Sequence, residues 1–174
     1  GLLLLARGRA AARRLTSSFA DRDMEKTYLA LVAGAAPADL RITDPLAKGG
    51  RAGFENMTVD PDGQPAESEM CRVDAAGNAF ALVALRPHTG RTHQLRVHTA
   101  HAGHPIVGDG KYGGTRGDAA AHPGGALARR LHLHAWRLRF PDGRQIEAPL
   151  PPHFRESLAA LGLAVPGADW QFAP

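Results

Sequence analysis

Histidine is the residue type that first suggests chemistry in this chain, because five of its nine histidines lie in the segment 86–114. Imidazole is a common metal ligand, so a zinc site is the first possibility. His98 and His101 are three residues apart and would share one face of a helix, whereas His93 would be turned away from His98. No cysteine or carboxylate joins them within the helix expected over 91–102, and zinc sites usually carry such ligands or a clear third histidine. We therefore expect no metal, and interpret these histidines as buried or surface residues of a basic helix.

The sequence argues against two further kinds of catalytic site. The stretch Gly108–Gly114 is rich in glycine, but it has neither the spacing nor the Lys-Ser/Thr pair of a phosphate-binding loop. A hydrolase built on a nucleophile elbow needs Gly-x-Ser-x-Gly, which does not occur. The single cysteine, Cys71, is best interpreted as a packed thiol, since no activating residue lies near it in the sequence. One cysteine cannot form an internal disulfide, which indicates a reducing, cytoplasmic compartment.

Two arginines of the same segment suggest a charged site. Arg91 and Arg96 are five residues apart, so they point in different directions from a helix. One of them then faces solvent or a phosphate group while the other faces inward. A buried arginine requires a partner, most naturally a carboxylate, because an unpaired buried charge is very costly. The residues alone leave open whether such a pair stabilises the fold or serves a site.

Hydrophobic patterning and turn residues predict the elements that must position these side chains. We expect strands at 2–5, 26–32 and 80–85, a hairpin at 131–140 and 144–148, and helices at 10–20, 91–102 and 151–161. Leu2–Leu5 is a short continuous apolar run, which is typical of a strand buried on both faces. Thr89 or Thr92 should cap the helix 91–102, and Gly103 should end it. Residues 35–66 should be loops around short strands, and residues 108–125 should be a loop.

The order of these elements predicts a single α+β domain with a mixed, largely antiparallel sheet and flanking helices. The chain has 174 residues, of which 44% are hydrophobic, so a substantial core is expected.

The formal charge of +4 is compatible with an anionic partner such as nucleic acid. No run approaches the ~18 apolar residues that cross a membrane, so we expect no membrane partner.

Residues 86–114 resemble the third signature of the RluA-type pseudouridine synthases. That signature reads Thr-Gly-Arg-Ser/Thr-His-Gln-Leu/Ile-Arg-Val-His, then Gly-His-Pro-Ile, Gly-Asp and Tyr-Gly, and all of it stands between Thr89 and Gly113. Residues 26–30 (KTYLA) are similar to the family's Lys-x-Tyr-x-Ala segment, and residues 131–135 (LHLHA) to its Leu-x-Leu-His-Ala strand. Residues 63–68 resemble its Gly-Lys-Pro-Ala-x-Thr segment, with glutamine for lysine and serine for threonine. The details are most similar to the RluC-like branch, which modifies large-subunit ribosomal RNA.

The resemblance implies an enzyme that isomerises uridine in ribosomal or transfer RNA without a metal or organic cofactor. Arg96 matches the family's arginine that pairs with the catalytic aspartate. Tyr28 matches its active-site tyrosine, which stacks on the flipped base and helps to remove a proton from C5. Candidates for phosphate or base contacts at the mouth of the pocket are Arg91, His93, Gln94 and Lys111. For Arg91 and Gln94, a structural role in the framework is equally compatible with the sequence. Leu133 either lines the pocket or belongs to the hydrophobic core.

The catalytic aspartate of the family has no counterpart in the sequence. The family carries it in Arg-Leu-Asp-x-x-Thr-Ser-Gly, and residues 1–6 resemble the end of that pattern, so the aspartate would lie five residues before Gly1. We therefore expect residues 1–174 to be part of a catalytic domain and to be inactive alone. The alternatives are a non-catalytic RNA-binding remnant and a synthase directed at transfer RNA. The protein is expected to be monomeric and cytoplasmic.

Overall fold

The computed structural model describes residues 1–20, 23–49, 56–118, 127–167 and 169–172. Six antiparallel strands form its main sheet, in the order β2 (Asp39–Ile42), β5 (Ser68–Ala76), β6 (Phe80–Pro87), β1 (Glu25–Ala33), β7 (Leu133–Arg139) and β8 (Gln145–Glu147). A small second sheet pairs β3 (Leu46–Gly49) with β4 (Asn56–Val59). The helices are α1 (Arg9–Ala20), α2 (Gln94–His101) and α3 (Pro152–Ala160). The predicted α+β class and antiparallel sheet are confirmed.

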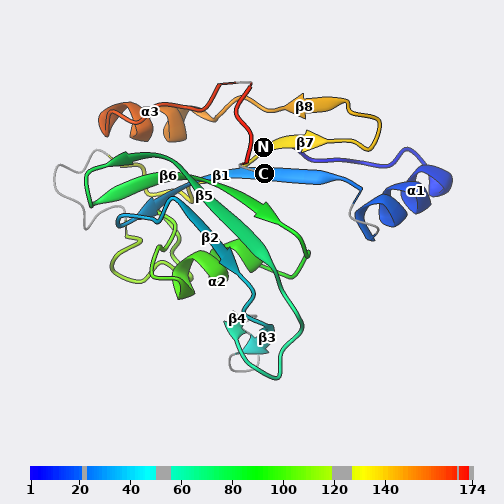
Figure 1. The fold of residues 1–174 in the computed structure, drawn as a ribbon, viewed down its shortest axis with the longest axis horizontal. Coiled ribbons are helices and arrows are strands. Elements are labelled where there is room, and N and C mark those ends of the chain that lie inside the picture. The colour runs from blue at the N-terminus through cyan, green and yellow to red at the C-terminus, as the bar shows by residue number, and fades with distance from the viewer. Residues whose placement is uncertain (21–22, 50–55, 119–126, 168, 173–174) are drawn as a thin grey trace.

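The main sheet is covered by α3 on one face and by α2 on the other, and the small sheet packs against α2 (Figure 1). The core follows the alternation of side chains along β1. Leu29 and Leu31 pack in one buried cluster with Phe154 of α3, whereas Ala30 packs in a second cluster with Leu95 of α2. Because both faces are buried, β1 reads as a continuous apolar run, which is why the sequence predicts it clearly.

The hairpin of β7 and β8 forms where the sequence predicts it. Phe140 and Arg144 close the turn, with the Phe140 N–H donating to the Arg144 carbonyl at 2.8 Å. Gly143 adopts a φ of 84°, a left-handed conformation that glycine reaches without strain. The Pro-Asp-Gly sequence therefore acts as a turn because its last residue tolerates positive φ.

The predicted buried strand at Leu2–Leu5 is wrong. These residues form no strand, and Leu3 and Leu5 are 80% and 74% exposed. The segment contacts β7 through one backbone hydrogen bond, in which the Leu2 N–H donates to the Ala135 carbonyl at 2.8 Å. A buried strand needs partners along its edges and cover on both faces, and among the described residues β7 pairs instead with β1 and β8. The apolar composition alone therefore overstated the burial of this segment.

Helix α2 begins later than predicted, and neither threonine caps it. Its N-cap is His93, which has a left-handed backbone with φ 53° and makes no side-chain capping hydrogen bond. Thr89 instead donates its hydroxyl to the Gln94 side-chain oxygen at 2.7 Å. Gln94 thus reaches back to the loop before the helix, and the Thr89 hydroxyl is engaged there instead of capping the helix. Gly103 ends the helical segment as predicted, with φ 83°.

No helix in the described part of the chain is long and apolar enough to span a membrane.

Candidate active site

A cleft of about 340 Å³ opens where β1, the end of β6, the start of α2 and the start of β7 meet. Six of the seven predicted site residues line it, and they are Tyr28, Arg91, His93, Gln94, Arg96 and Leu133. The other lining residues are Lys26, Pro87, Thr89, Gly90 and Leu95. The charged side chains in this set are all cationic, since the described residues that line the cleft include no aspartate or glutamate. The cleft therefore suits an anionic ligand such as a nucleotide.

Tyr28 lies in the middle of the sheet, on the strand that joins the two cores. It pairs with Leu85 of β6 and with Ala135 of β7, beside a shift in the β1–β7 register. Tyr28 and Leu133 are both half-buried against the cluster that contains Leu95. Burial raises the pKa of the Tyr28 hydroxyl above its usual value. The ring thus contributes a largely apolar surface to the cleft, which suits stacking on a base.

Arg96 faces inward and pairs with a carboxylate, as the spacing of the two arginines predicts. Its Nε donates to Asp109 Oδ2 at 2.9 Å, and its Nη2 donates to Asp109 Oδ1 at 2.6 Å. The Asp109 side chain is 1% exposed and that of Arg96 is 18% exposed. This side-on contact uses Nε and Nη2, and the described residues place no hydrogen bond on Nη1. The remaining nitrogen is therefore available to a second anion.

Asp109 is held ionised by the groups around it. Burial would raise the pKa of its carboxyl group, but hydrogen bonds from Arg96 and from the backbone N–H groups of Tyr112 and Lys111 outweigh that effect and lower the pKa. The side chain accepts four hydrogen bonds in all. Asp109 is thus a fixed counter-charge whose oxygens are already engaged.

Tyr112 packs against the guanidinium group of Arg96. The Arg96 guanidinium lies 4.9 Å from the centre of the Tyr112 ring, a distance typical of a cation–π contact. The Tyr112 hydroxyl accepts a hydrogen bond from the Met57 N–H at 3.1 Å and lies 2.8 Å from His93 Nδ1. These contacts connect His93 in the cleft to β4, and they explain why His93 keeps a strained left-handed backbone.

Gln94 fixes the loop that forms one wall of the cleft. It is 4% exposed, and its side-chain oxygen accepts hydrogen bonds from the Thr89 hydroxyl and the Arg91 N–H. Its amide nitrogen donates to the Glu67 carbonyl and to the Ser68 hydroxyl, both at 2.8 Å. These four contacts saturate the amide, which favours the framework interpretation of Gln94.

The remaining candidates divide between the cleft and its surroundings. Arg91 is exposed and donates from Nε to the Pro65 carbonyl at 3.0 Å. Lys111 is not among the residues that line the cleft, and its ammonium group lies 5.6 Å from the centre of the Tyr112 ring. Lys26 lines the cleft although the sequence did not single it out, and burial lowers the pKa of its ammonium group.

Sequence reasoning also missed Asp109 and Tyr112 as residues of the site. Both lie in the Gly-Asp and Tyr-Gly parts of the signature. The signal for Asp109 was the requirement that an inward-facing Arg96 have a carboxylate partner. Asp109 supplies this carboxylate from 13 residues further along the chain. The contacts of Tyr112 depend on tertiary structure, and no signal in the sequence predicts them.

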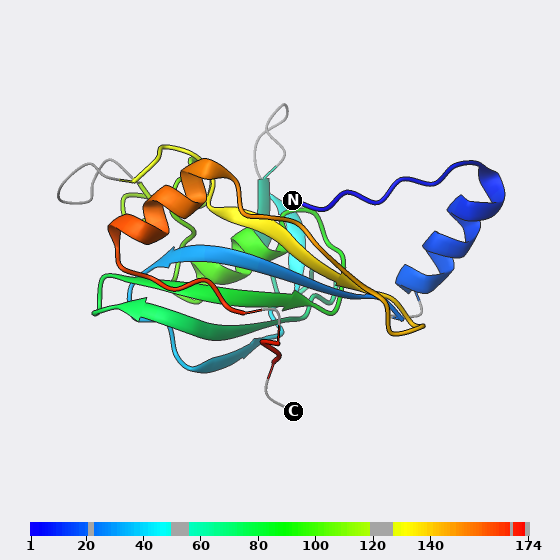
Figure 2. The same cartoon turned by 90° about the horizontal axis from the view of Figure 1, so that it is seen from above.

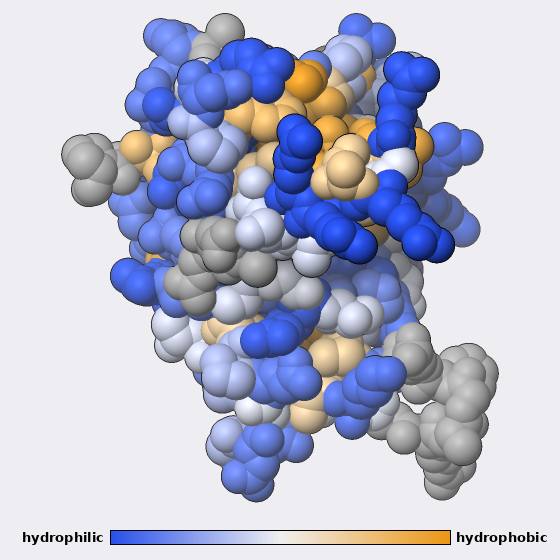
Figure 3. Space-filling model, turned by 90° about the vertical axis from the view of Figure 1, so that its right-hand side faces the viewer, coloured by the Kyte–Doolittle hydropathy of each residue, from blue (hydrophilic) through white to orange (hydrophobic). Residues whose placement is uncertain are grey.

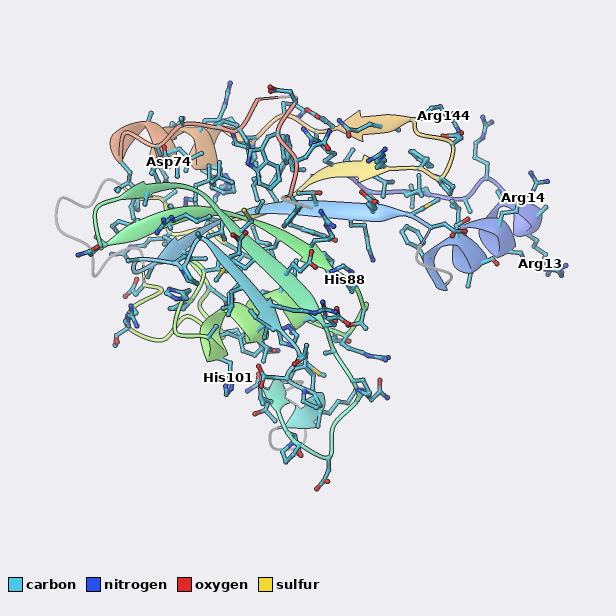
Figure 4. The ribbon with its side chains drawn as sticks, viewed as in Figure 1. Arg13, Arg14, Asp74, His88, His101 and Arg144 are labelled. Carbon is cyan, nitrogen blue, oxygen red and sulfur yellow. The ribbon has the colours of Figure 1, made fainter. Side chains whose placement is uncertain are left out.

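The histidines that suggested a metal have other contacts. His98 is buried, with Nδ1 3.0 Å from the Ser68 hydroxyl and Nε2 3.0 Å from the Asp44 carbonyl. His101 is exposed at the end of α2, as Figure 4 shows. Within the described residues, no three His, Cys, Asp or Glu side chains are arranged to hold a metal ion.

Burial raises the pKa of the Cys71 thiol to about 11, which favours the packed-thiol interpretation.

Comparison with known proteins places these residues in a family. Residues 1–101 match the family model described as RNA pseudouridylate synthase. The chain belongs to the RNA pseudouridylate synthase family. This match covers the strand of Tyr28 and the helix of Arg96 up to its last residue. The resemblance inferred from the signatures is therefore confirmed.

Individual relatives agree with this assignment. The chain is 37% identical over 168 residues to ribosomal large subunit pseudouridine synthase C of Salmonella typhi, and the match covers 92% of this chain and 52% of that protein. The protein of the same name from Yersinia pestis is 39% identical over 168 residues, with the same coverage. The chain therefore spans about half the length of the curated relatives it matches.

Solved structures of human family members share the fold. Human RNA pseudouridylate synthase domain containing 4 matches with a TM-score of 0.74 at 28% identity, over 92% of this chain and 70% of that chain. Human RNA pseudouridylate synthase domain containing 1 matches with a TM-score of 0.68 at 32% identity, over 89% and 65% of the two chains. The sheet and helices described above are thus those of the family.

Replacing Asp109 with Asn tests the buried pair through its dependence on pH. Because the folded-state pKa of Asp109 is lowered, its ionised form stabilises the fold above the unfolded pKa of about 3.9, and that contribution is lost as the pH falls through the folded value. We expect Asp109→Asn to reduce the free energy of unfolding by about 3 kcal/mol between pH 5 and 8. The difference should shrink below about pH 4. Urea unfolding of both proteins measures it, and a difference that does not change with pH would contradict the assignment.

Proposed function

We propose that this protein is an RNA pseudouridine synthase that acts on large-subunit ribosomal RNA. The observation that carries the proposal is that Tyr28 and Arg96, to which the family resemblance gives catalytic roles, line one cationic cleft. The relatives reported above are named for the large ribosomal subunit, which supports ribosomal over transfer RNA as the substrate. We take the cleft as a site for a single nucleotide. The target uridine must therefore leave the base stack of the RNA before the reaction.

The proposed reaction is an isomerisation with no net oxidation. An aspartate attacks the target nucleoside, either at C1′ of the ribose or on the base, and the N1–C1′ glycosidic bond breaks. The uracil rotates, a new bond forms between C5 and C1′, and the bond to the aspartate breaks again, which restores the free carboxylate. The C5 proton is released, and the former N1 position gains a proton. The residues of the site must therefore hold the base, stabilise the nucleophile and accept one proton.

Each of these tasks has a candidate in the cleft. The Tyr28 ring stacks on the extruded uracil, and its oxygen accepts the C5 proton in the phenolate form. Arg96 uses its Nη1 to hold the nucleophilic carboxylate ionised and in place while Asp109 fixes the guanidinium from the other side. Lys26 and Arg91 contribute positive charge for the phosphates on either side of the target.

The nucleophile is proposed to come from a segment outside these 174 residues. No carboxylate among the described residues lines the cleft. Asp109 is a poor nucleophile, because it is buried and its oxygens accept four hydrogen bonds. We accordingly expect the 174-residue chain alone to bind RNA without isomerising it.

Release of tritium tests the proposed function. The complete protein encoded by the reading frame should release tritium into water from large-subunit ribosomal RNA that contains [5-³H]uridine, because C5 loses its hydrogen when the new carbon–carbon bond forms. Transfer RNA labelled in the same way is the comparison substrate. Release from neither RNA would overturn the proposal, and release from transfer RNA alone would overturn the choice of substrate.

Replacing Tyr28 with Phe separates stacking from proton transfer. The ring is kept, so the affinity for RNA should change less than about twofold, while kcat should fall by about 10²-fold or more because general-base catalysis contributes that much. Burial raises the pKa of Tyr28, so pH 6–9 lies wholly below this pKa and the phenolate is a minor species. Its fraction, and therefore kcat of the wild-type enzyme, should increase with pH throughout this range. The variant should lose this increase. A kcat within threefold of wild type would show that the ring only stacks.

A further inference from the structure

Helix α1 and the residues before it form a cationic surface that the proposed site does not use. Residues 1–20 contain no aspartate or glutamate and four arginines, Arg7, Arg9, Arg13 and Arg14, which we call the α1 arginines. All four are exposed. Among the described residues, no carboxylate lies within ion-pair distance of any of them. Their positive charge is therefore available to an external anion.

The geometry of α1 presents this charge to solvent. The helix stands away from the sheet, beyond the end of β1 (Figure 2). Arg13 and Arg14 project from the side of α1 that faces away from the sheet (Figure 4). Arg9 and Arg13 lie one turn apart, about 6 Å along the helix axis, so they share one face. In Figure 3, which views the molecule from this end, strongly hydrophilic side chains project in front of an apolar patch.

The opposite face of α1 is turned toward the site. Phe19 lies in contact with Lys26, whose ammonium group is 5.1 Å from the ring centre. Phe19 also lines a cavity of about 240 Å³ together with Leu2 and Tyr28. Lys26 and Tyr28 line both this cavity and the candidate active site. The C-terminal end of α1 thus lies next to a cavity that adjoins the cleft, and the α1 arginines point away from it.

We propose that the α1 arginines form a second contact surface for RNA, which binds the phosphates of the strand that flanks the target uridine. The inference rests on the proposed function, because it takes RNA as the ligand of the cleft. Arginine pairs with phosphate bidentately, and a row of arginines beside the site extends the cationic cleft to neighbouring nucleotides. A basic amphipathic helix also suits an anionic membrane surface, and Phe19 remains 37% exposed. RNA is favoured because Phe19 contacts Lys26, a lining residue of the cleft, which places the α1 arginines next to the proposed RNA site.

A matched pair of variants tests this surface in the complete protein. The first carries Arg9→Gln, Arg13→Gln and Arg14→Gln. The control removes the same charge from three exposed arginines elsewhere in the chain, with Arg129→Gln and Arg130→Gln in the loop before β7 and Arg155→Gln in α3. Binding to a large-subunit ribosomal RNA fragment is measured across a series of salt concentrations, together with KM, kcat and the circular dichroism of each variant.

The α1 variant should bind RNA at least tenfold more weakly, and the slope of log K against log[salt] should fall by about 2–3, since each phosphate contact contributes about 0.7–0.9. KM should rise to a similar extent while kcat at saturating RNA stays within twofold of wild type. The control should change each quantity less than twofold. Equal effects of the two variants would overturn the proposal, as would unchanged RNA binding with a loss of binding to vesicles of anionic lipid. If the wild-type enzyme releases no tritium, the proposed function fails, while the affinity measurements still test the α1 surface.

Discussion

Replacing Arg96 with Met is expected to abolish uridine isomerisation while RNA binding remains within about threefold of wild type. Methionine keeps much of the length of the side chain, but it removes the group that is proposed to hold the nucleophilic carboxylate. The loss of one such charged contact costs about 10²–10³-fold in turnover, and a misplaced nucleophile adds to it. Single-turnover release of tritium from saturating [5-³H]uridine RNA measures the chemical step without a contribution from binding.

A fall in stability must be separated from the loss of catalysis in this variant. Arg96→Met leaves Asp109 buried without its partner, which costs about 3–5 kcal/mol. The double variant Arg96→Met with Asp109→Asn removes the unpaired charge, so it should recover most of the stability and none of the activity. Arg91→Met is the matched control at the edge of the cleft, and it should raise KM with little effect on kcat. Turnover above one tenth of wild type in the double variant would contradict the role of Arg96.

Replacing Gly108 with Ala is expected to reduce stability about as much as Arg96→Met does. Gly108 has φ 75°, and an added Cβ would overlap the backbone carbonyl of Arg130. Backbone atoms of this neighbour cannot move aside as the end of a flexible side chain can. Gly108 also donates its N–H to the Gly117 carbonyl at 2.8 Å, so a shift of the residue breaks the turn that presents Asp109. We expect a loss of roughly 3–5 kcal/mol in the free energy of unfolding.

Gly110→Ala is the control for this prediction. It lies two residues away in the same loop, has no positive φ, and offers open space to a Cβ. Its effect should stay within about 1 kcal/mol. Thermal and urea unfolding of both variants measure the difference, and equal stabilities would show that the Gly108 turn is not a constraint on the fold. The comparison also explains why glycine precedes aspartate in the signature.

The sequence predicted the fold well where local patterns determine structure. β1 and β6 are buried on both faces, so their apolar runs are unambiguous, and the Pro-Asp-Gly turn between β7 and β8 has a direct backbone cause. The prediction failed at Leu2–Leu5, because apolar composition gives the tendency of a segment to be buried and not whether partners surround it. It also failed at the start of α2, where Thr89 donates to the Gln94 side chain and no side chain caps the helix.

The prediction of the site was also correct in part. The family resemblance selected Tyr28 and Arg96, and the structure places both at one cleft. It did not distinguish residues that face the cleft from residues that support it. Gln94 is saturated by internal hydrogen bonds, and Lys111 lies outside the cleft. Those distinctions depend on contacts between β5, α2 and the loop after it, which sequence spacing does not report.

The pseudouridine content of large-subunit ribosomal RNA tests the central claim most directly. RNA from a strain that lacks this reading frame should lose pseudouridine at one or more specific positions, and expression of the wild-type gene should restore them. Expression of the Arg96→Met variant at equal protein level should not. Ribosomal RNA with every pseudouridine intact in the deletion strain, or full restoration by Arg96→Met, would contradict the account.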